Sequence, residues 1–281
     1  MPRRVAVVIG AGSVKCSAGL GLMKVLQREG IGVDLFVGCS GGALYATLMA
    51  EGLSPDDAAD KVSRLWTRKV TEKKNRKALL SALFPRLFGF KAEFGMTDDG
   101  PVNALFRGQW GDRTIESLPT PLHITATDFE TGEQAILSKG RIVDALRASI
   151  AIPFVFAPWR VDGRLLSDGF LSDPLPVGVA IREGADVILA MGFDAALQSR
   201  VDSAARFAFQ VSSVMTNNLL KANFAFHTLA HHHEVIPIVP QFSQRIRLFD
   251  TEKIPYLIEE GEKATMALLP HIRRALQGEA G

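Results

Sequence analysis

Short apolar runs alternate with helical patterns along most of the chain. Several runs, such as Val5–Ile9 and Val187–Met191, are continuously apolar, which is typical of strands covered on both faces of a sheet. The predicted strands are Val5–Ile9, Val33–Val37, Leu122–Thr127, Gln134–Leu137, Leu165–Ser167, Val187–Met191 and Val235–Val239. The predicted helices are Gly19–Glu29, Ala43–Ala50, Pro55–Lys69, Arg141–Ser149, Pro176–Glu183, Phe207–Ala230 and Lys253–Leu276. This alternation predicts an α/β fold in which a parallel or mixed sheet lies between helical layers.

Composition indicates how many domains the chain forms. Of the 281 residues, 47% are hydrophobic and 22% are charged, which is sufficient for one large core. No linker, repeat or low-complexity tract divides the sequence. We therefore expect a single α/β domain over residues 1–281.

Cysteine use and hydropathy bear on the cellular compartment. Cys16 and Cys39 both lie beside glycine-rich turns and suggest no disulfide framework, which favours a reducing environment. The first apolar run ends at Gly10, too early for a signal peptide, and no run reaches the roughly 18 apolar residues of a membrane span. We expect a soluble, cytoplasmic protein.

A glycine-flanked serine follows the second predicted strand. Gly38-x-Ser40-x-Gly42 matches the nucleophile elbow, a tight turn from strand to helix that exposes the serine hydroxyl. The two glycines allow the neighbouring backbone to approach closely. The helix N-terminus at this turn favours negative charge that develops during acyl chemistry. The alternative interpretation is a serine that only caps a core helix.

The loop after the first strand, residues 10–17, is also rich in glycine. It is not a dinucleotide site, because Lys15 occupies the third glycine position, and it lacks the Gly-Lys-[Ser/Thr] end of a phosphate-binding loop. Gly10 and Gly38 both end strands, so both loops are expected at the same rim of the sheet. The loop would then present backbone N–H groups beside Ser40, where an anionic intermediate needs two or more fixed donors.

A base for Ser40 must come from elsewhere in the chain. Asp168-Gly169 follows an apolar run, and its carboxylate would accept the serine proton if burial raised the pKa above its reference value of ~3.9. A simple turn is the alternative interpretation. Asp162-Gly163 has the flanking alternation of a hairpin and predicts a type I′ turn.

The histidines favour neither a triad nor a metal site. His123 lies within a strand pattern, which favours a position in the core. The run His231-His232-His233-Glu234 suggests a metal site, but adjacent side chains point in different directions and no further ligands accompany them. We expect no metal.

In combination, these segments resemble the patatin-like phospholipases, particularly the short bacterial ones. Members of this family show Gly-Gly-Gly-x-[Lys/Arg]-Gly, then Gly-x-Ser-x-Gly, then Asp-Gly-[Gly/Ala]. Residues 11–16 (AGSVKC), 38–42 (GCSGG) and 168–170 (DGF) stand in these three places, in that order. Similar stretches at 126–133, 146–156 and 173–177 extend the resemblance over nearly the whole chain.

The resemblance implies a three-layer α/β/α fold with a central, mainly parallel sheet. It also implies a serine acyl hydrolase of the phospholipase A or lysophospholipase type, with lipid or phospholipid esters as substrates and an acyl-enzyme intermediate. Ser40 would be the nucleophile and Asp168 the base of a catalytic dyad. No cofactor and no nucleic-acid partner are implied. Backbone N–H groups of Gly12, Ser13 and Gly41 would form the oxyanion hole, and the motifs would be supported by Gly10, Lys15, Gly38, Gly42 and Gly169.

Two departures from the family pattern leave other functions open. Ala11, Ser13 and Cys16 dilute the glycine-rich loop, and Phe170 replaces a small residue, which would narrow the pocket and favour slim acyl chains. An acyltransferase or thioesterase would use the same dyad with another acyl acceptor. A non-catalytic lipid-binding protein would use the same scaffold without the chemistry.

Charge is concentrated in one segment. The net charge of the chain is +2, yet residues 61–91 contain ten lysines and arginines and a single acid, Glu72. Leucines and phenylalanines accompany these cations, so residues 66–91 are candidates for contact with an anionic membrane surface. We interpret residues 66–100 as a lid or membrane-facing insertion. The alternative is a solvated helix followed by one that packs on the core.

Overall fold

The computed structural model describes residues 3–195, 197, 200–229 and 234–278. Within them, eight strands form one sheet in the order β5-β6-β3-β2-β1-β7-β8, and β4 pairs with β3. Strands β3, β2, β1, β7 and β8 are parallel to one another, whereas β4 and β6 pair antiparallel with β3, and β5 pairs antiparallel with β6. The strands are β1 (Val5–Ile9), β2 (Leu35–Cys39), β3 (Leu122–Asp128), β4 (Gln134–Leu137), β5 (Trp159–Val161), β6 (Arg164–Asp168), β7 (Val187–Met191) and β8 (Glu234–Ile238).

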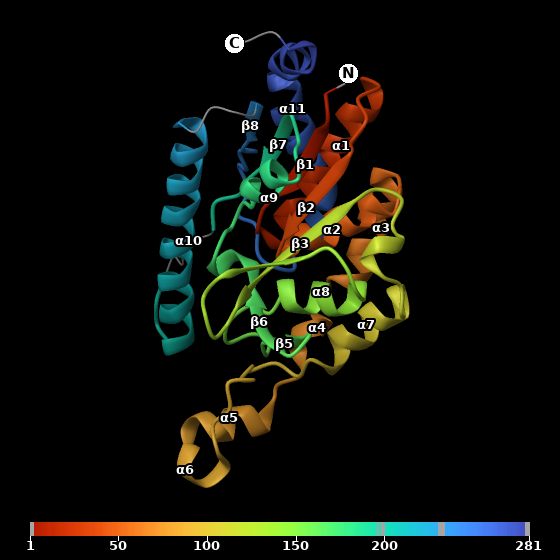
Figure 1. The fold of residues 1–281 in the computed structure, drawn as a ribbon. Coiled ribbons are helices and arrows are strands. Elements are labelled where there is room, and N and C mark those ends of the chain that lie inside the picture. Colours follow the sequence, from red (N-terminus) through yellow and green to blue (C-terminus); the bar gives the residue numbers. More distant parts are fainter. Residues whose placement is uncertain (1–2, 196, 198–199, 230–233, 279–281) are drawn as a thin grey trace.

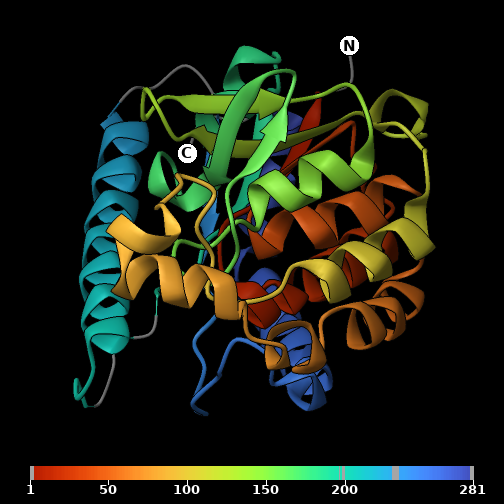
Figure 2. The same ribbon diagram turned by 90° about the horizontal axis from the view of Figure 1, so that it is seen from below.

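Helices cover both faces of the sheet (Figures 1 and 2). Alternate residues of β1 point into different cores: Val7 packs with α1, α2 and α11, whereas Val8 packs with α9 and Leu220 of α10. This gives the three-layer α/β/α arrangement with a mainly parallel sheet, as predicted. The helices are α1 (Ala18–Arg28), α2 (Gly41–Ala50), α3 (Pro55–Leu65), α4 (Lys69–Glu72), α5 (Arg76–Leu83), α6 (Pro85–Phe88), α7 (Gly100–Trp110), α8 (Ile142–Ser149), α9 (Val177–Arg182), α10 (Ala204–Leu229) and α11 (Ile254–Gln277).

The predicted strands and helices are confirmed, with shifts at their ends. All the predicted strands are present, and Asp162-Gly163 joins β5 to β6 with positive φ at both residues, as a type I′ turn requires. The predicted helix Pro55–Lys69 ends at Leu65. Strand β5 and helices α4 to α7 were not predicted, although Pro101 stands at the start of α7.

A protruding arm interrupts the compact body between α4 and α7 (Figure 1). The segments that enter and leave the arm are joined at its base, where the backbone N–H of Asn75 donates to the carbonyl oxygen of Met96. Helices α5 and α6 beyond this neck bury no residue, so the alternative of a helix packed on the core is wrong. Among the described residues, no helix is long and apolar enough to cross a membrane.

Candidate active site

Ser40 lies between the end of β2 and the first residue of α2. Its backbone has φ 54° and ψ −126°, a conformation that L-residues rarely adopt. A Cβ atom at Gly38 would lie 2.5 Å from the Cα atom of Ala43, and one at Gly42 would lie 2.5 Å from the carbonyl oxygen of Gly10. The glycines of the elbow are therefore required by close backbone approach.

A second serine holds this strained turn in place. The Oγ atom of Ser149, at the end of α8, accepts a hydrogen bond of 2.8 Å from the backbone N–H of Ser40. The same hydroxyl donates to the carbonyl oxygen of Thr125 on β3, at 2.7 Å. Ser149 thus fixes the elbow to the neighbouring strand. Ser149 lies in the family-like stretch 146–156, and no role was predicted for it from the sequence.

Ser40 and Asp168 are in direct contact, although 128 positions separate them in the sequence. The Oγ atom of Ser40 donates a hydrogen bond of 2.7 Å to Oδ2 of Asp168. The pairing of β6 with β3, and of β3 with β2, brings the end of β6 to the end of β2. The other carboxylate oxygen, Oδ1, accepts from the backbone N–H of Phe170 at 3.1 Å. Both carboxylate oxygens therefore accept a hydrogen bond, and the two bonds fix the orientation of the carboxylate.

Burial makes Asp168 a stronger base than an ordinary aspartate. The residue is fully buried, and this desolvation raises the pKa of its carboxyl from 3.8 to about 7. The hydrogen bonds from Ser40 and Phe170 oppose the rise without cancelling it. The burial that the sequence argument required is present. A carboxylate with a pKa near neutrality can accept a proton from a hydroxyl during a reaction.

The residues expected around the oxyanion also lie at this rim. A Cβ atom at Gly41 would be 2.6 Å from the backbone nitrogen of Ser13, so the glycine-rich loop touches the elbow. None of the described residues accepts a hydrogen bond from the backbone N–H of Gly12, Ser13 or Gly41. The side chain of Ser13 points away, because its hydroxyl donates to the carbonyl oxygen of Leu248 at 2.6 Å. Three donors are therefore available beside Ser40.

The remaining motif residues support this arrangement. A Cβ atom at Gly169 would lie 2.6 Å from the carbonyl oxygen of Thr125, and one at Gly10 would lie 2.7 Å from the carbonyl oxygen of Pro174. Both positions therefore require glycine. Lys15 donates from Nζ to the carbonyl oxygen of Asp194 at 3.0 Å, and burial lowers its pKa. Cys16 is buried, and this burial raises the pKa of its thiol.

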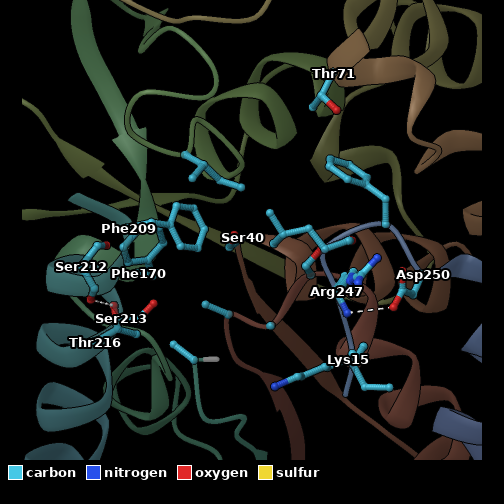
Figure 3. Close-up of a pocket in the computed structure, with 18 of the residues that line it drawn as sticks. Lys15, Ser40, Thr71, Phe170, Phe209, Ser212, Ser213, Thr216, Arg247 and Asp250 are labelled. Atoms are coloured by element: carbon cyan, nitrogen blue, oxygen red, sulfur yellow. Dashed lines mark hydrogen bonds between the residues drawn. The ribbon is translucent and has the colours of Figure 1, made fainter. Parts of the chain in front are cut away.

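A cavity of about 710 Å³ opens above Ser40 (Figure 3). Phe170 forms part of its wall, together with Ile152 and Phe209 of α10. Whether Phe170 narrows the cavity enough to favour slim acyl chains stays a prediction. Two walls were not foreseen from the sequence: one is α10, and the other is the loop of residues 245–250 after β8. No motif marks either of them.

Neither His123 nor His271 lines this cavity. His123 lies on β3, as predicted, and its Nε2 atom is 3.7 Å from a carboxylate oxygen of Glu183. His231, His232 and His233 lie outside the described residues. Among the residues that the structure describes, no group of three or more histidine, cysteine, aspartate or glutamate side chains could hold a metal ion.

Comparison with known proteins places these motifs in a family. The profile of the family described as patatin-like phospholipase matches residues 7–181, which include both Ser40 and Asp168. The chain belongs to the patatin-like phospholipase family. The predicted resemblance is confirmed.

Patatin-like relatives share part of their length with this chain. An uncharacterized NTE family protein of Mycobacterium tuberculosis is 31% identical over 191 residues, covering 68% of this chain and 49% of the relative. The mouse patatin-like phospholipase domain-containing protein 7 is 28% identical over 189 residues, covering 66% of this chain and 13% of that protein. The chain thus spans about half the length, or less, of these curated relatives.

Solved structures with a similar course of the chain include VipD from Legionella pneumophila. It has a TM-score of 0.49 at 16% identity, covering 96% of this chain and 67% of VipD. Human GIVD cytosolic phospholipase A2 has a TM-score of 0.47 at 12% identity, covering 99% of this chain and 60% of that one.

Proposed function

We propose that this protein is a serine acyl hydrolase that cleaves lipid esters through a dyad of Ser40 and Asp168. The observation that carries the proposal is the 2.7 Å hydrogen bond between Ser40 Oγ and Asp168 Oδ2 below the cavity. Membership of a family of phospholipases supports a lipid ester as the substrate. The apolar side chains of the cavity wall, such as Phe170, Phe209 and Leu248, support an acyl chain as the bound group.

In the first half-reaction, Ser40 Oγ attacks the ester carbonyl carbon while Asp168 accepts the hydroxyl proton. The negative charge that develops on the carbonyl oxygen is stabilised by the backbone N–H groups of Gly12, Ser13 and Gly41. The tetrahedral intermediate collapses, the alcohol leaves with the proton held by Asp168, and the acyl group stays on Ser40 as an ester.

In the second half-reaction, water takes the place of the alcohol. Asp168, again ionised, accepts a proton from the water as its oxygen attacks the acyl-enzyme carbonyl carbon. The intermediate collapses, Ser40 recovers its proton from Asp168, and the fatty acid is released. No group outside the described dyad and the backbone donors is needed to balance these steps.

The direct test uses a fluorophosphonate probe, which labels activated serine nucleophiles. We expect one label per chain, on Ser40, and loss of p-nitrophenyl butyrate hydrolysis in both Ser40→Ala and Asp168→Asn. Ser213→Ala is the matched control, because this buried serine lines the same cavity from α10 without touching the dyad. Retained hydrolysis in Ser40→Ala would refute the proposal. Adding glycerol to the assay shows whether an alcohol replaces water as the acyl acceptor.

The arm supports peripheral contact of residues 66–91 with a membrane. Its apolar side chains are exposed, with Leu83 at 71% and Leu87 at 78%, although such side chains are ordinarily buried. Arg76, Lys77 and Arg86 on the same two helices form no ion pair with any described residue. Apolar side chains among free cations are the composition of an interfacial anchor for anionic lipids.

The arm also connects to the cavity, which supports a role in substrate access. Arg68, Thr71 and Lys74, at and beside α4, line the cavity. We therefore propose residues 66–100 as the insertion that delivers a membrane lipid to Ser40, within a single domain over residues 1–281. Peripheral attachment at the cytoplasmic face of a membrane is the corresponding location.

A further inference from the structure

The loop of residues 245–250 forms one side of the cavity, and it lies beyond residues 7–181, which match the family profile. Figure 3 shows Arg247 on this side of Ser40, and Phe170 and Phe209 on the opposite side. Phe170 and the described residues of α10 contribute only uncharged side chains to the cavity lining, whereas the loop adds Arg245 and Arg247 among its apolar side chains. An ester bound at Ser40 would therefore meet cationic groups on the loop side and none from α10.

The backbone of this loop is held firmly. The carbonyl oxygen of Leu248 accepts from Ser13 Oγ at 2.6 Å and from Trp66 Nε1 at 3.0 Å. The carbonyl oxygen of Arg245 accepts from Lys253 Nζ at 2.6 Å. The loop is thus fixed to the same residue, Ser13, that offers a backbone donor to the oxyanion.

The arginine side chains of the loop are free, in contrast to its acid. Asp250 is buried and is engaged by Arg68 at 3.3 Å and by the backbone N–H of Arg247 at 3.0 Å. The guanidinium groups of Arg245 and Arg247 are exposed, and no described residue forms a hydrogen bond or ion pair with them. The charged residues that line the cavity are Lys15, Arg68, Lys74, Arg245 and Arg247 on the basic side, and Glu72, Asp194 and Asp250 on the acidic side.

We propose that Arg245 and Arg247 form an anion subsite that selects lipid esters with a phosphate-bearing, negatively charged headgroup. A planar guanidinium donates two parallel hydrogen bonds to phosphate oxygens, which suits a phosphodiester better than a single ammonium group does. The acyl chain lies against Phe170 and Phe209, and the headgroup-bearing alcohol lies against the loop and departs from there. This inference rests on the proposed hydrolase function and adds the substrate class to it.

The test compares monomeric substrates, so that binding of the arm to a lipid surface plays no part. Dihexanoylphosphatidylglycerol and dihexanoylphosphatidylcholine differ only in headgroup, and p-nitrophenyl hexanoate has none. We expect the wild-type protein to have a higher kcat/KM for phosphatidylglycerol than for phosphatidylcholine. In the double variant Arg245→Gln/Arg247→Gln, the ratio of the two should fall about tenfold, as for the loss of a charge-assisted contact.

A second double variant controls for net charge. Arg107→Gln/Arg274→Gln removes the same charge from α7 and α11, where neither residue lines the cavity. This control should keep the wild-type ratio.

Each outcome has a distinct meaning. A ratio that stays the same in the loop variant overturns the anion subsite, and it does so even if the p-nitrophenyl ester is cleaved. Inhibition by inorganic phosphate together with an unchanged ratio would assign the arginines to a free anion and likewise overturn the lipid proposal. Absence of hydrolysis of all three esters by the wild-type protein would instead refute the hydrolase function.

Discussion

Replacing Asp168 with asparagine should change how the stability of the protein depends on pH. The buried carboxyl has a pKa of about 7 in the folded protein, against 3.8 for an aspartate exposed to water, as in the unfolded chain. Between these values the folded protein binds this proton more tightly than the unfolded chain. Burying the ionised form therefore costs stability, and the free energy of unfolding falls as pH rises through this window.

The magnitude follows from the difference between the two pKa values. At 1.36 kcal/mol per pKa unit, the full cost above pH 7 is about 4 kcal/mol, of which roughly 3 kcal/mol develops between pH 5 and pH 8. Asparagine has nearly the same shape and no charge, so this portion of the pH dependence should vanish in Asp168→Asn. At about 2 °C per kcal/mol for a chain of this size, the corresponding change in Tm is about 6 °C.

The assay is thermal unfolding followed by circular dichroism at pH 5 and pH 8, for the wild type and for Asp168→Asn. The wild-type Tm should drop more than the variant Tm between the two conditions, and the variant should be the more stable protein at pH 8. Asp112→Asn is the control. The side chain of Asp112 is 94% exposed, so this substitution removes the same charge from a carboxyl that is not buried. If Asp168→Asn loses as much Tm as the wild type between pH 5 and pH 8, the carboxyl does not titrate in that range and our account of the base is wrong.

Three further predictions concern the rate, the elbow and the arm. The kcat/KM for p-nitrophenyl butyrate should rise with pH to a plateau, with an apparent pKa near 7, because only ionised Asp168 accepts the serine proton; a pH-independent rate between pH 5.5 and pH 8 would contradict this. Ser149→Ala should lower kcat about tenfold with KM nearly unchanged, because the backbone of Ser40 loses its anchor, whereas Ser149→Thr should restore part of the rate. Leu83→Ser/Leu87→Ser should reduce cosedimentation with phosphatidylglycerol vesicles several-fold and spare hydrolysis of a soluble ester; equal binding would remove the arm from membrane contact.

The sequence was most informative where chemistry and local backbone coincide. The elbow at Ser40 needs glycines at fixed positions because neighbouring backbone passes close to them. The elbow can therefore be recognised from the sequence motif. The hairpin at Asp162-Gly163 can also be predicted from the sequence, because its turn needs two residues with positive φ. Continuous apolar runs such as Val187–Met191 likewise reveal strands that are covered on both faces.

Long-range placement could not be worked out in this way. The contact of Ser40 with Asp168 depends on the order of strands in the sheet. The residues alone made Asp168 a candidate base but left a simple turn open, and the resemblance to a family favoured the dyad. Ser149 looks like any polar residue at the end of a helix, and its role depends on two backbone partners from other elements. Helix α7 was readable in principle, because Val102, Phe106 and Trp110 recur at helical spacing and are buried.

The cavity is lined by residues both within and beyond the stretch that matches the family profile. Ser40 and Asp168 lie in the stretch shared with the family, whereas Phe209 and the arginines at 245 and 247 come from the C-terminal third of the chain. Mutations in that third can change which substrates the cavity admits without moving Ser40 or Asp168. The architecture therefore lends itself to diversification by exchange of C-terminal segments, and chimeras joined after residue 191, at the end of β7, are the natural way to transplant selectivity between relatives.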